Sequence, residues 1–107
     1  MTIYALSTPP GVSGIAIIRL SGTNALRIAK DFVGTIDKPR MAILKNIVDS
    51  KHKIIDEGIV IWYPKGQSYT GDDLVEFHIH GSKAVINKFL NELSLRSDCQ
   101  LAQPGEF

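Results

Sequence analysis

The order in which strand-like and helix-like segments follow one another constrains the fold of this chain most. Two short apolar segments, residues 2–6 and 15–20, are followed by apolar side chains at helical spacing up to Gly34. Residues 39–48 and 54–63 then have the pattern of a hairpin around a short polar turn. This irregular order, without an evident internal repeat, favours an α+β fold with a mixed or mostly antiparallel sheet over a βαβαβ array.

The last third of the chain predicts another strand and the second of two main helices. Residues 74–80 alternate between apolar and polar side chains, which is the period of a strand with one buried face. Residues 85–93 then carry apolar side chains at helical spacing. A last short strand is expected at residues 99–102.

Local signals predict where these elements begin, end and bend. Ser21 or Thr23 is expected to cap the first helix, and Gly34 is placed to end it. The Gly81-Ser82 pair suits the start of the second helix. Gly58, inside the second arm of the hairpin, indicates a bulge.

Length, charge and cysteine content limit the number of domains, the partners and the disulfides that the protein can have. The 107 residues have room for one domain, spanning residues 1–107, with one modest core. Twelve basic against eleven acidic side chains give a net charge of +1, which provides no strong attraction to nucleic acid or acidic lipid. Cys99 is the single cysteine, so we expect no internal disulfide. Without a membrane-length apolar run or a signal-peptide pattern, a cytoplasmic protein is expected.

The polar residues of the alternating strand allow three interpretations. Glu76, His78 and His80 share one face at intervals of about 7 Å, which offers a carboxylate and two imidazoles to one metal ion or one substrate. A histidine there is also a candidate general base or pH sensor. The plainest interpretation is a solvated strand face. A metal-binding or RNA-binding module built on this face is the alternative function.

Arg19 is the most informative single residue, because it shares a strand face with Ile15 and Ile17. Burial of an unpaired guanidinium is costly, so Arg19 needs either solvent at the strand end or an anion. One interpretation is solvent exposure. The other is an ion pair with Glu76 at the mouth of a pocket, since both are ionisable residues in otherwise apolar strands.

Two loops and the cysteine are weaker candidates. Residues 11–14 contain the glycines of a phosphate-binding loop but lack the Lys-Ser/Thr pair that would follow, which leaves a backbone nest as the means of holding an anion. Residues 69–73 form a turn that is able to cover a pocket. Cys99 is expected to pack in the core rather than to act as a nucleophile.

Six short blocks stand out along the chain. They are Ser7-Thr8-Pro9-Pro10-Gly11, Ile17-Ile18-Arg19-Leu20-Ser21-Gly22, Pro39-Arg40, the stretch from Ser68 to Glu76, His80-Gly81 and Pro104-Gly105-Glu106-Phe107. In order and spacing they resemble the N-terminal domain of the MnmE/TrmE family of tRNA modification GTPases. The resemblance covers essentially all of residues 1–107.

The resemblance implies a fold, a cofactor and partners. The fold is an α+β domain like the tetrahydrofolate-binding part of glycine-cleavage T-protein, which in this family forms a homodimer and binds a 5-formyl-tetrahydrofolate-type one-carbon cofactor. The parent proteins are implied to hydrolyse GTP with Mg²⁺ and K⁺ in a separate G domain. They act with the flavin-dependent subunit MnmG (GidA) to install an aminomethyl or carboxymethylaminomethyl group at carbon 5 of the tRNA wobble uridine.

Two family folate contacts fall on residues of this chain. The arginine of the I-I-R-x-S-G block is Arg19, and the glutamate of the T-G-x-D-x-x-E block is Glu76. The resemblance assigns no catalytic or metal-binding residue here, and the family usually has glutamine or another polar residue at the position of His78. A third contact, a lysine beyond the P-G-E-F block, has no counterpart. We therefore expect a non-catalytic fragment without the helical and G domains, which dimerises and binds folate more weakly than a longer chain.

Overall fold

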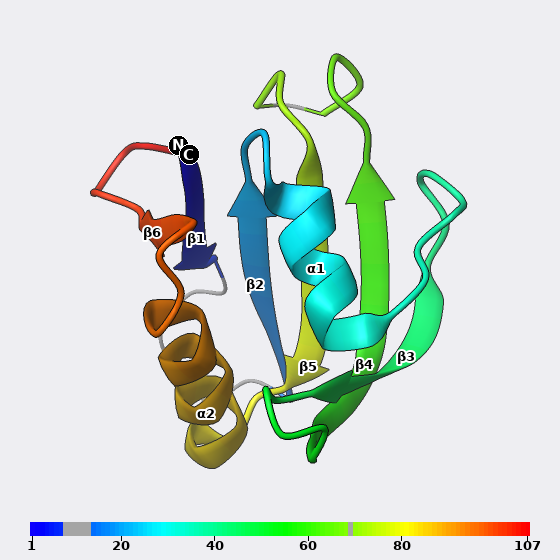
Figure 1. The fold of residues 1–107 in the computed structure, drawn as a ribbon, viewed down its shortest axis with the longest axis vertical. Coiled ribbons are helices and arrows are strands. Elements are labelled where there is room, and N and C mark those ends of the chain that lie inside the picture. The colour runs from blue at the N-terminus through cyan, green and yellow to red at the C-terminus, as the bar shows by residue number, and fades with distance from the viewer. Residues whose placement is uncertain (8–13, 69) are drawn as a thin grey trace.

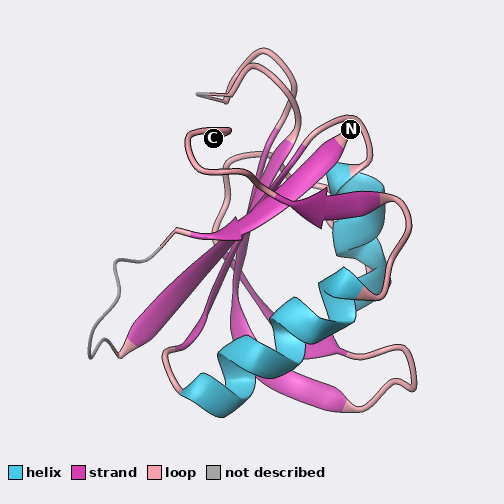
Figure 2. Cartoon of the chain, turned by 90° about the vertical axis from the view of Figure 1, so that its left-hand side faces the viewer, coloured by secondary structure: helices cyan, strands magenta, loops and turns pink. Residues whose placement is uncertain are grey.

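The computed structural model describes residues 1–7, 14–68 and 70–107. Its strands and helices, in chain order, are β1 (Thr2–Leu6), β2 (Ile15–Ser21), α1 (Ala25–Val33), β3 (Ile43–Val48), β4 (Ile54–Tyr63), β5 (Leu74–His80), α2 (Lys83–Ser94) and β6 (Cys99–Leu101). Within this part of the chain the strands form one sheet in the order β3-β4-β5-β2-β1-β6. Both helices cover the same face of the sheet (Figures 1 and 2). The α+β class, the mixed sheet and the two main helices predicted from the sequence are confirmed.

The centre of the sheet is formed by β2 and β5, which are distant in sequence. They pair antiparallel along their whole lengths, from Ile15 opposite His80 to Ser21 opposite Leu74. β6 pairs parallel with β1, so the first and last strands of the described chain are neighbours (Figure 1). β6 reaches this position because the chain crosses the sheet after β5, and α2 forms that crossover connection between β5 and β6.

The core lies between the two helices and the face of the sheet that they cover. Phe89 of α2 packs against Phe32 of α1 and Phe77 of β5, with ring centroids 5.0 and 4.9 Å apart. All three rings are buried, and each contributes about 1.5–3 kcal/mol by leaving water. The aromatic contacts therefore fix both helices on the same central strand. In the described residues, no helix has the length and apolar character needed to cross a membrane.

The start of α1 differs from the prediction. Its N-cap residue is Asn24, whose side chain makes no capping hydrogen bond. Instead, the hydroxyl oxygen of the buried Thr2 accepts from the backbone N–H of Asn24 at 2.9 Å. The prediction that Ser21 or Thr23 caps this helix was wrong, because the Ser21 hydroxyl donates to Thr70 Oγ1 at 2.9 Å.

The other helix boundaries follow the sequence signals. Gly34 ends α1 with a φ of +78°, a conformation that glycine adopts without strain. Ser82 caps α2 by accepting from the Val85 backbone N–H at 3.2 Å. The hairpin is also present, although its first arm begins at Ile43 rather than at residue 39.

The bulge predicted at Gly58 is absent from that position. Gly58 pairs in regular register with Lys45, and the shift in register lies between Ile47 and Val48. A Cβ atom at Gly58 would overlap the carbonyl oxygen of His78. Glycine is required here because β4 and β5 approach closely, a reason that the sequence of β4 alone does not reveal.

Candidate functional site

The polar residues predicted as site candidates lie on the face of the sheet that faces away from the helices. In β2, Ile18 and Leu20 are fully buried in the core, so Arg19 between them points to the other face. In β5, Val75 and Phe77 are likewise fully buried, and Glu76 points away from them. The register of the two strands places Arg19 directly opposite Glu76.

Arg19 and Glu76 form a partly buried ion pair. Arg19 Nε donates to Glu76 Oε2 at 2.7 Å, and the two side chains are 29% and 10% exposed. Of the two interpretations of Arg19, the ion pair is therefore confirmed. The plain solvated face is wrong for Glu76, because Arg19 and the neighbouring strands shield its carboxylate from water.

His78 holds the second oxygen of the same carboxylate. Its Nε2 lies 3.1 Å from Glu76 Oε1, and its side chain is 26% exposed. Burial by itself would raise the pKa of Glu76, but hydrogen bonds from His78 and Arg19, together with the Arg19 charge, bring the pKa below its ordinary value. Glu76 is therefore ionised at neutral pH and acts only as a hydrogen-bond acceptor.

His80 does not join this cluster. Its Nδ1 lies 2.8 Å from Asp56 Oδ1, and its backbone N–H donates to Asp56 Oδ2 at 2.8 Å. The convergence of Glu76, His78 and His80 on one metal ion is therefore not observed. In residues 1–7, 14–68 and 70–107, no group of three or more His, Cys, Asp or Glu side chains is arranged to hold a metal ion.

The Arg19–Glu76 pair lines a cavity of about 250 Å³ on the helix-free face of the sheet. Its lining residues are Arg19, Tyr63, Gln67, Ser68, Leu74 and Glu76. Tyr63 is the residue of β4 that pairs with Leu74 of β5. Burial and the nearby Glu76 carboxylate raise the pKa of Tyr63 despite the Arg19 charge, so its phenol stays protonated as a hydrogen-bond donor.

The loop residues Gln67 and Ser68 line one side of this cavity, whereas none of residues 70–73, the described part of the predicted covering turn, lines it. Asp73 Oδ1 accepts from the Lys65 backbone N–H at 2.9 Å and so ties the two ends of the loop together. Ser68 and Ser21 contact the Thr70 hydroxyl at 3.0 and 2.9 Å, which joins the loop to β2. Tyr69 of the predicted turn lies outside the described residues.

The structure tests the prediction for Cys99 but not the prediction for residues 11–14. Of the glycine-containing segment 11–14, only Gly14 belongs to the part of the chain that the structure describes, so the anion nest stays a prediction. Cys99 is buried, and its Sγ lies 3.6 Å from the Leu93 carbonyl oxygen. Burial raises the pKa of Cys99, in agreement with a packing role rather than a nucleophilic one.

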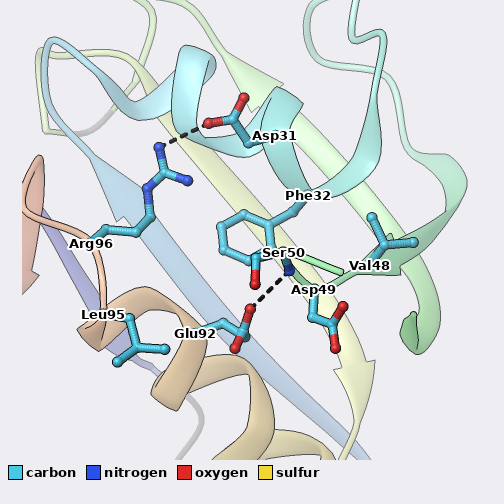
Figure 3. Close-up of a pocket in the computed structure, with 8 residues that line it drawn as sticks. All are labelled: Asp31, Phe32, Val48, Asp49, Ser50, Glu92, Leu95 and Arg96. Carbon is cyan, nitrogen blue, oxygen red and sulfur yellow. Dashed lines mark hydrogen bonds and ion pairs between the residues drawn. The ribbon is translucent and has the colours of Figure 1, made fainter. Parts of the chain in front are cut away.

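A second cavity, of about 210 Å³, lies between α1, the C-terminal end of α2 and the turn after β3 (Figure 3). Its charged groups are engaged by other groups of the protein. Arg96 donates to Asp31 at 2.8 Å, and Glu92 accepts from the Ser50 backbone N–H at 3.0 Å. These contacts join α1 and the β3–β4 turn to the end of α2, so we attribute this cavity to packing between elements.

The groups that line the first cavity determine which type of ligand would fit it. An ionised carboxylate accepts from N–H donors, and a fixed guanidinium beside it keeps the carboxylate charged and oriented. Tyr63 and Leu74 add flat and apolar surface. The site is therefore suited to a planar heterocycle with adjacent N–H donors. Tyr63, Gln67 and Ser68 also line the cavity, although the sequence did not identify them as site candidates.

Comparisons with known proteins agree on one family. Residues 2–107 match the family described as GTP-binding protein TrmE N-terminus. The chain is 50% identical to the tRNA modification GTPase MnmE of Pelagibacter ubique, over 100% of this chain and 25% of that protein. It is 42% identical to the mitochondrial tRNA modification GTPase mss1 of Schizosaccharomyces pombe, over 99% of this chain and 22% of that protein. The chain thus spans about a quarter of the length of these relatives.

Proposed function

The chain belongs to the family of TrmE N-terminal domains, and we propose that it binds a reduced folate of the 5-formyl-tetrahydrofolate type. The observation that carries this proposal is the Arg19–Glu76 pair, brought together from distant strands in a cavity of about 250 Å³. These are the two residues onto which the family resemblance maps folate contacts. A pterin ring presents a ring N–H and an exocyclic amine side by side, which is the donor pattern that a carboxylate accepts.

Glu76 is able to accept the pterin while it keeps both of its protein donors. Each carboxylate oxygen has two lone-pair positions, so Oε1 and Oε2 each retain one for a ligand. Arg19 uses Nε to hold Oε2 at 2.7 Å. This supports a role for Arg19 in keeping Glu76 ionised and correctly oriented, which is one of the roles open to it from the sequence.

We also propose that the domain forms a homodimer through the helix-free face of the sheet. Ile15 lies on this face, because it is opposite His80, which shares a face of β5 with His78. Leu44 lies there too, because it is opposite Ile59, which is itself opposite His78. Their side chains are 59% and 56% exposed, and a second copy would remove them from water. Two ligand cavities would then lie near the dimer interface.

The relatives, which are tRNA modification GTPases, and the family resemblance support a proposal for the whole protein. We propose that the domain serves a tRNA modification GTPase that acts with MnmG (GidA) on carbon 5 of the wobble uridine. The bound folate is then the one-carbon cofactor of that modification. GTP, Mg²⁺ and K⁺ would bind in other domains of such a parent.

Calorimetric titration with 5-formyl-tetrahydrofolate tests the proposal. We expect saturable binding by the wild-type chain and a loss of about tenfold or more in affinity for Glu76→Gln and Arg19→Ala, because each removes a charge-assisted hydrogen bond. Glu57→Gln is the matched control, since Glu57 is an exposed carboxylate on the neighbouring strand that does not line this cavity. No binding by the wild-type chain at millimolar ligand, or equal affinities for Glu76→Gln and wild type, would overturn the proposal.

A further inference from the structure

The Glu76 carboxylate is held from two sides, and only one of the two donors lines the ligand cavity. Arg19 binds Oε2 and is part of the cavity wall. His78 binds Oε1 at 3.1 Å but lines the adjoining hollow of about 220 Å³, together with Ile15, Leu44 and Ile59. His78 therefore reaches the acceptor group of the proposed site from outside the cavity.

The strands around His78 direct its ring toward Glu76. His78 and Glu76 share one face of β5, two residues apart, so their side chains are neighbours about 7 Å apart along the strand. The residues directly opposite His78 on the two flanking strands are Ile17 and Ile59. Cross-strand neighbours on one face have Cβ atoms about 5 Å apart, so both sides of the ring meet apolar side chains. On the described part of this face, the Glu76 carboxylate is the acceptor within hydrogen-bond distance of its Nε2.

The charge of Glu76 determines which hydrogen His78 presents. An ionised carboxylate only accepts, so a 3.1 Å contact with Nε2 requires the hydrogen on Nε2. Together with the Arg19 Nε–H, this hydrogen fixes the rotation of the carboxylate plane. One lone pair of each oxygen is then occupied by protein, and each oxygen keeps one for a ligand.

We propose that His78 is a positioning residue of the ligand site, which holds Glu76 as a fixed two-point acceptor without touching the ligand. This inference rests on the proposed folate site. It assigns to His78 a role that a glutamine side-chain amide would also perform, because the amide carries an N–H donor at the end of a side chain of similar reach. It also predicts that a side chain of similar size without a donor does not substitute for histidine.

Substitution of His78 separates positioning from packing. We expect His78→Leu to weaken 5-formyl-tetrahydrofolate binding about tenfold, because Oε1 loses a charge-assisted donor and Arg19 then holds the carboxylate at one oxygen only. His78→Gln is expected to restore affinity to within about threefold of wild type. His80→Leu is the matched control, since His80 lies on the same strand face but pairs with Asp56; it is expected to stay within about twofold. Equal affinities for His78→Leu and wild type, or a His78→Gln variant as weak as His78→Leu, overturn the inference.

The ring nitrogens of His78 provide a readout that does not depend on ligand binding, and its deciding measurement uses the wild-type protein. In ¹⁵N-labelled wild-type protein, we expect the neutral ring of His78 to carry its hydrogen on Nε2, with a mixture of tautomers in Glu76→Gln. A neutral ring protonated on Nδ1 in the wild-type protein overturns the inference. Absence of folate binding by the wild-type protein, with the Nε2 tautomer present, overturns the proposed function and with it the role of His78 as a ligand-site residue.

Discussion

Away from the proposed site, Arg96 forms ion pairs with two carboxylates. Its Nε and Nη2 donate to the two carboxylate oxygens of Asp98 at 2.9 Å, and Nη2 also donates to Asp31 of α1 at 2.8 Å. The guanidinium carbon lies 5.9 Å from the centroid of the Phe32 ring. The bidentate pair with Asp98 raises the pKa of Arg96 and, by the same hydrogen bonds, lowers the pKa of Asp98. Arg96 thus connects α1 to the segment between α2 and β6.

The lowered pKa of Asp98 predicts a pH dependence of stability. A carboxyl group whose pKa is lower in the folded than in the unfolded state stabilises the fold above its unfolded pKa, and this contribution is lost as pH falls through the folded pKa. We expect the free energy of unfolding to fall more steeply below about pH 4 in wild type than in Asp98→Asn, measured by urea unfolding at several pH values. Asp37→Asn, which removes an exposed carboxylate, is the control. Equal slopes for wild type and Asp98→Asn would contradict this account.

At the scale of elements, β4 and β5 depend on a glycine for their close approach. The sheet holds five residue pairs between these strands, from Ile59 opposite His78 to Tyr63 opposite Leu74. Gly58 immediately precedes these pairs and lies beside the backbone of His78. Because β5 also carries Glu76, the spacing of β4 and β5 positions one wall of the cavity at the proposed site.

Gly58→Ala tests this close approach. The added methyl group would meet the backbone carbonyl of His78, which does not move aside as a flexible side chain does. We expect a loss of about 1–3 kcal/mol in the free energy of unfolding, measured by urea denaturation. Gly14→Ala is the matched control, because a Cβ there meets no described atom within 4 Å. A Gly58→Ala variant as stable as Gly14→Ala would show that the strands have room for the methyl group.

The sequence predicts the elements better than the contacts between them. Hydrophobic periodicity is a local property, and it gives β1 and β5 with the bounds found in the structure. The hydrogen bond from Asn24 to Thr2, by contrast, joins residues 22 positions apart. Periodicity carries no information on such a contact, and the same is true of the neighbour that requires Gly58.

Part of the candidate site could be predicted from the sequence, for a reason other than hydrophobic periodicity. Arg19 and Glu76 are ionisable residues in apolar strands, and burial requires each to have a partner. That requirement made their pairing one of two interpretations of Arg19, the other being solvent at the strand end, and the structure decides between them. Gln67 and Ser68 lie in a loop where polar residues are ordinary, so nothing in their pattern indicates that they line a cavity.

At the scale of the whole molecule, the two faces of the sheet differ in what covers them. One face is covered by α1 and α2 and holds the core (Figure 2). The other face carries the Arg19–Glu76 ion pair, the cavity that this pair lines, and exposed isoleucine and leucine side chains. Ligand binding and self-association are therefore proposed for the same surface, while folding stability resides mainly on the other.

Substitution on the helix-free face tests the proposed dimer. We expect the wild-type chain to be dimeric at about 10 μM and the doubly substituted Ile15→Asp, Leu44→Asp chain to be monomeric, because two buried carboxylates per copy would lose solvation. Sedimentation velocity over a concentration series measures the state. Leu95→Asp is the control, since Leu95 is 72% exposed at the end of α2. A dimeric double variant, or a monomeric Leu95→Asp, would contradict this location of the interface.

The Arg19–Glu76 pairing has a further consequence for how the chain selects its native arrangement. A slip of β2 along β5 by one residue would bring Arg19 opposite Val75 or Phe77 and force one strand to present its opposite face to the helices. The guanidinium or the carboxylate would then enter the aromatic interior without a counter-charge, at a cost of several kcal/mol. The two side chains that make the proposed site thus also disfavour a shifted register of β2 and β5. Selection that maintains ligand binding would therefore also maintain the correct strand register.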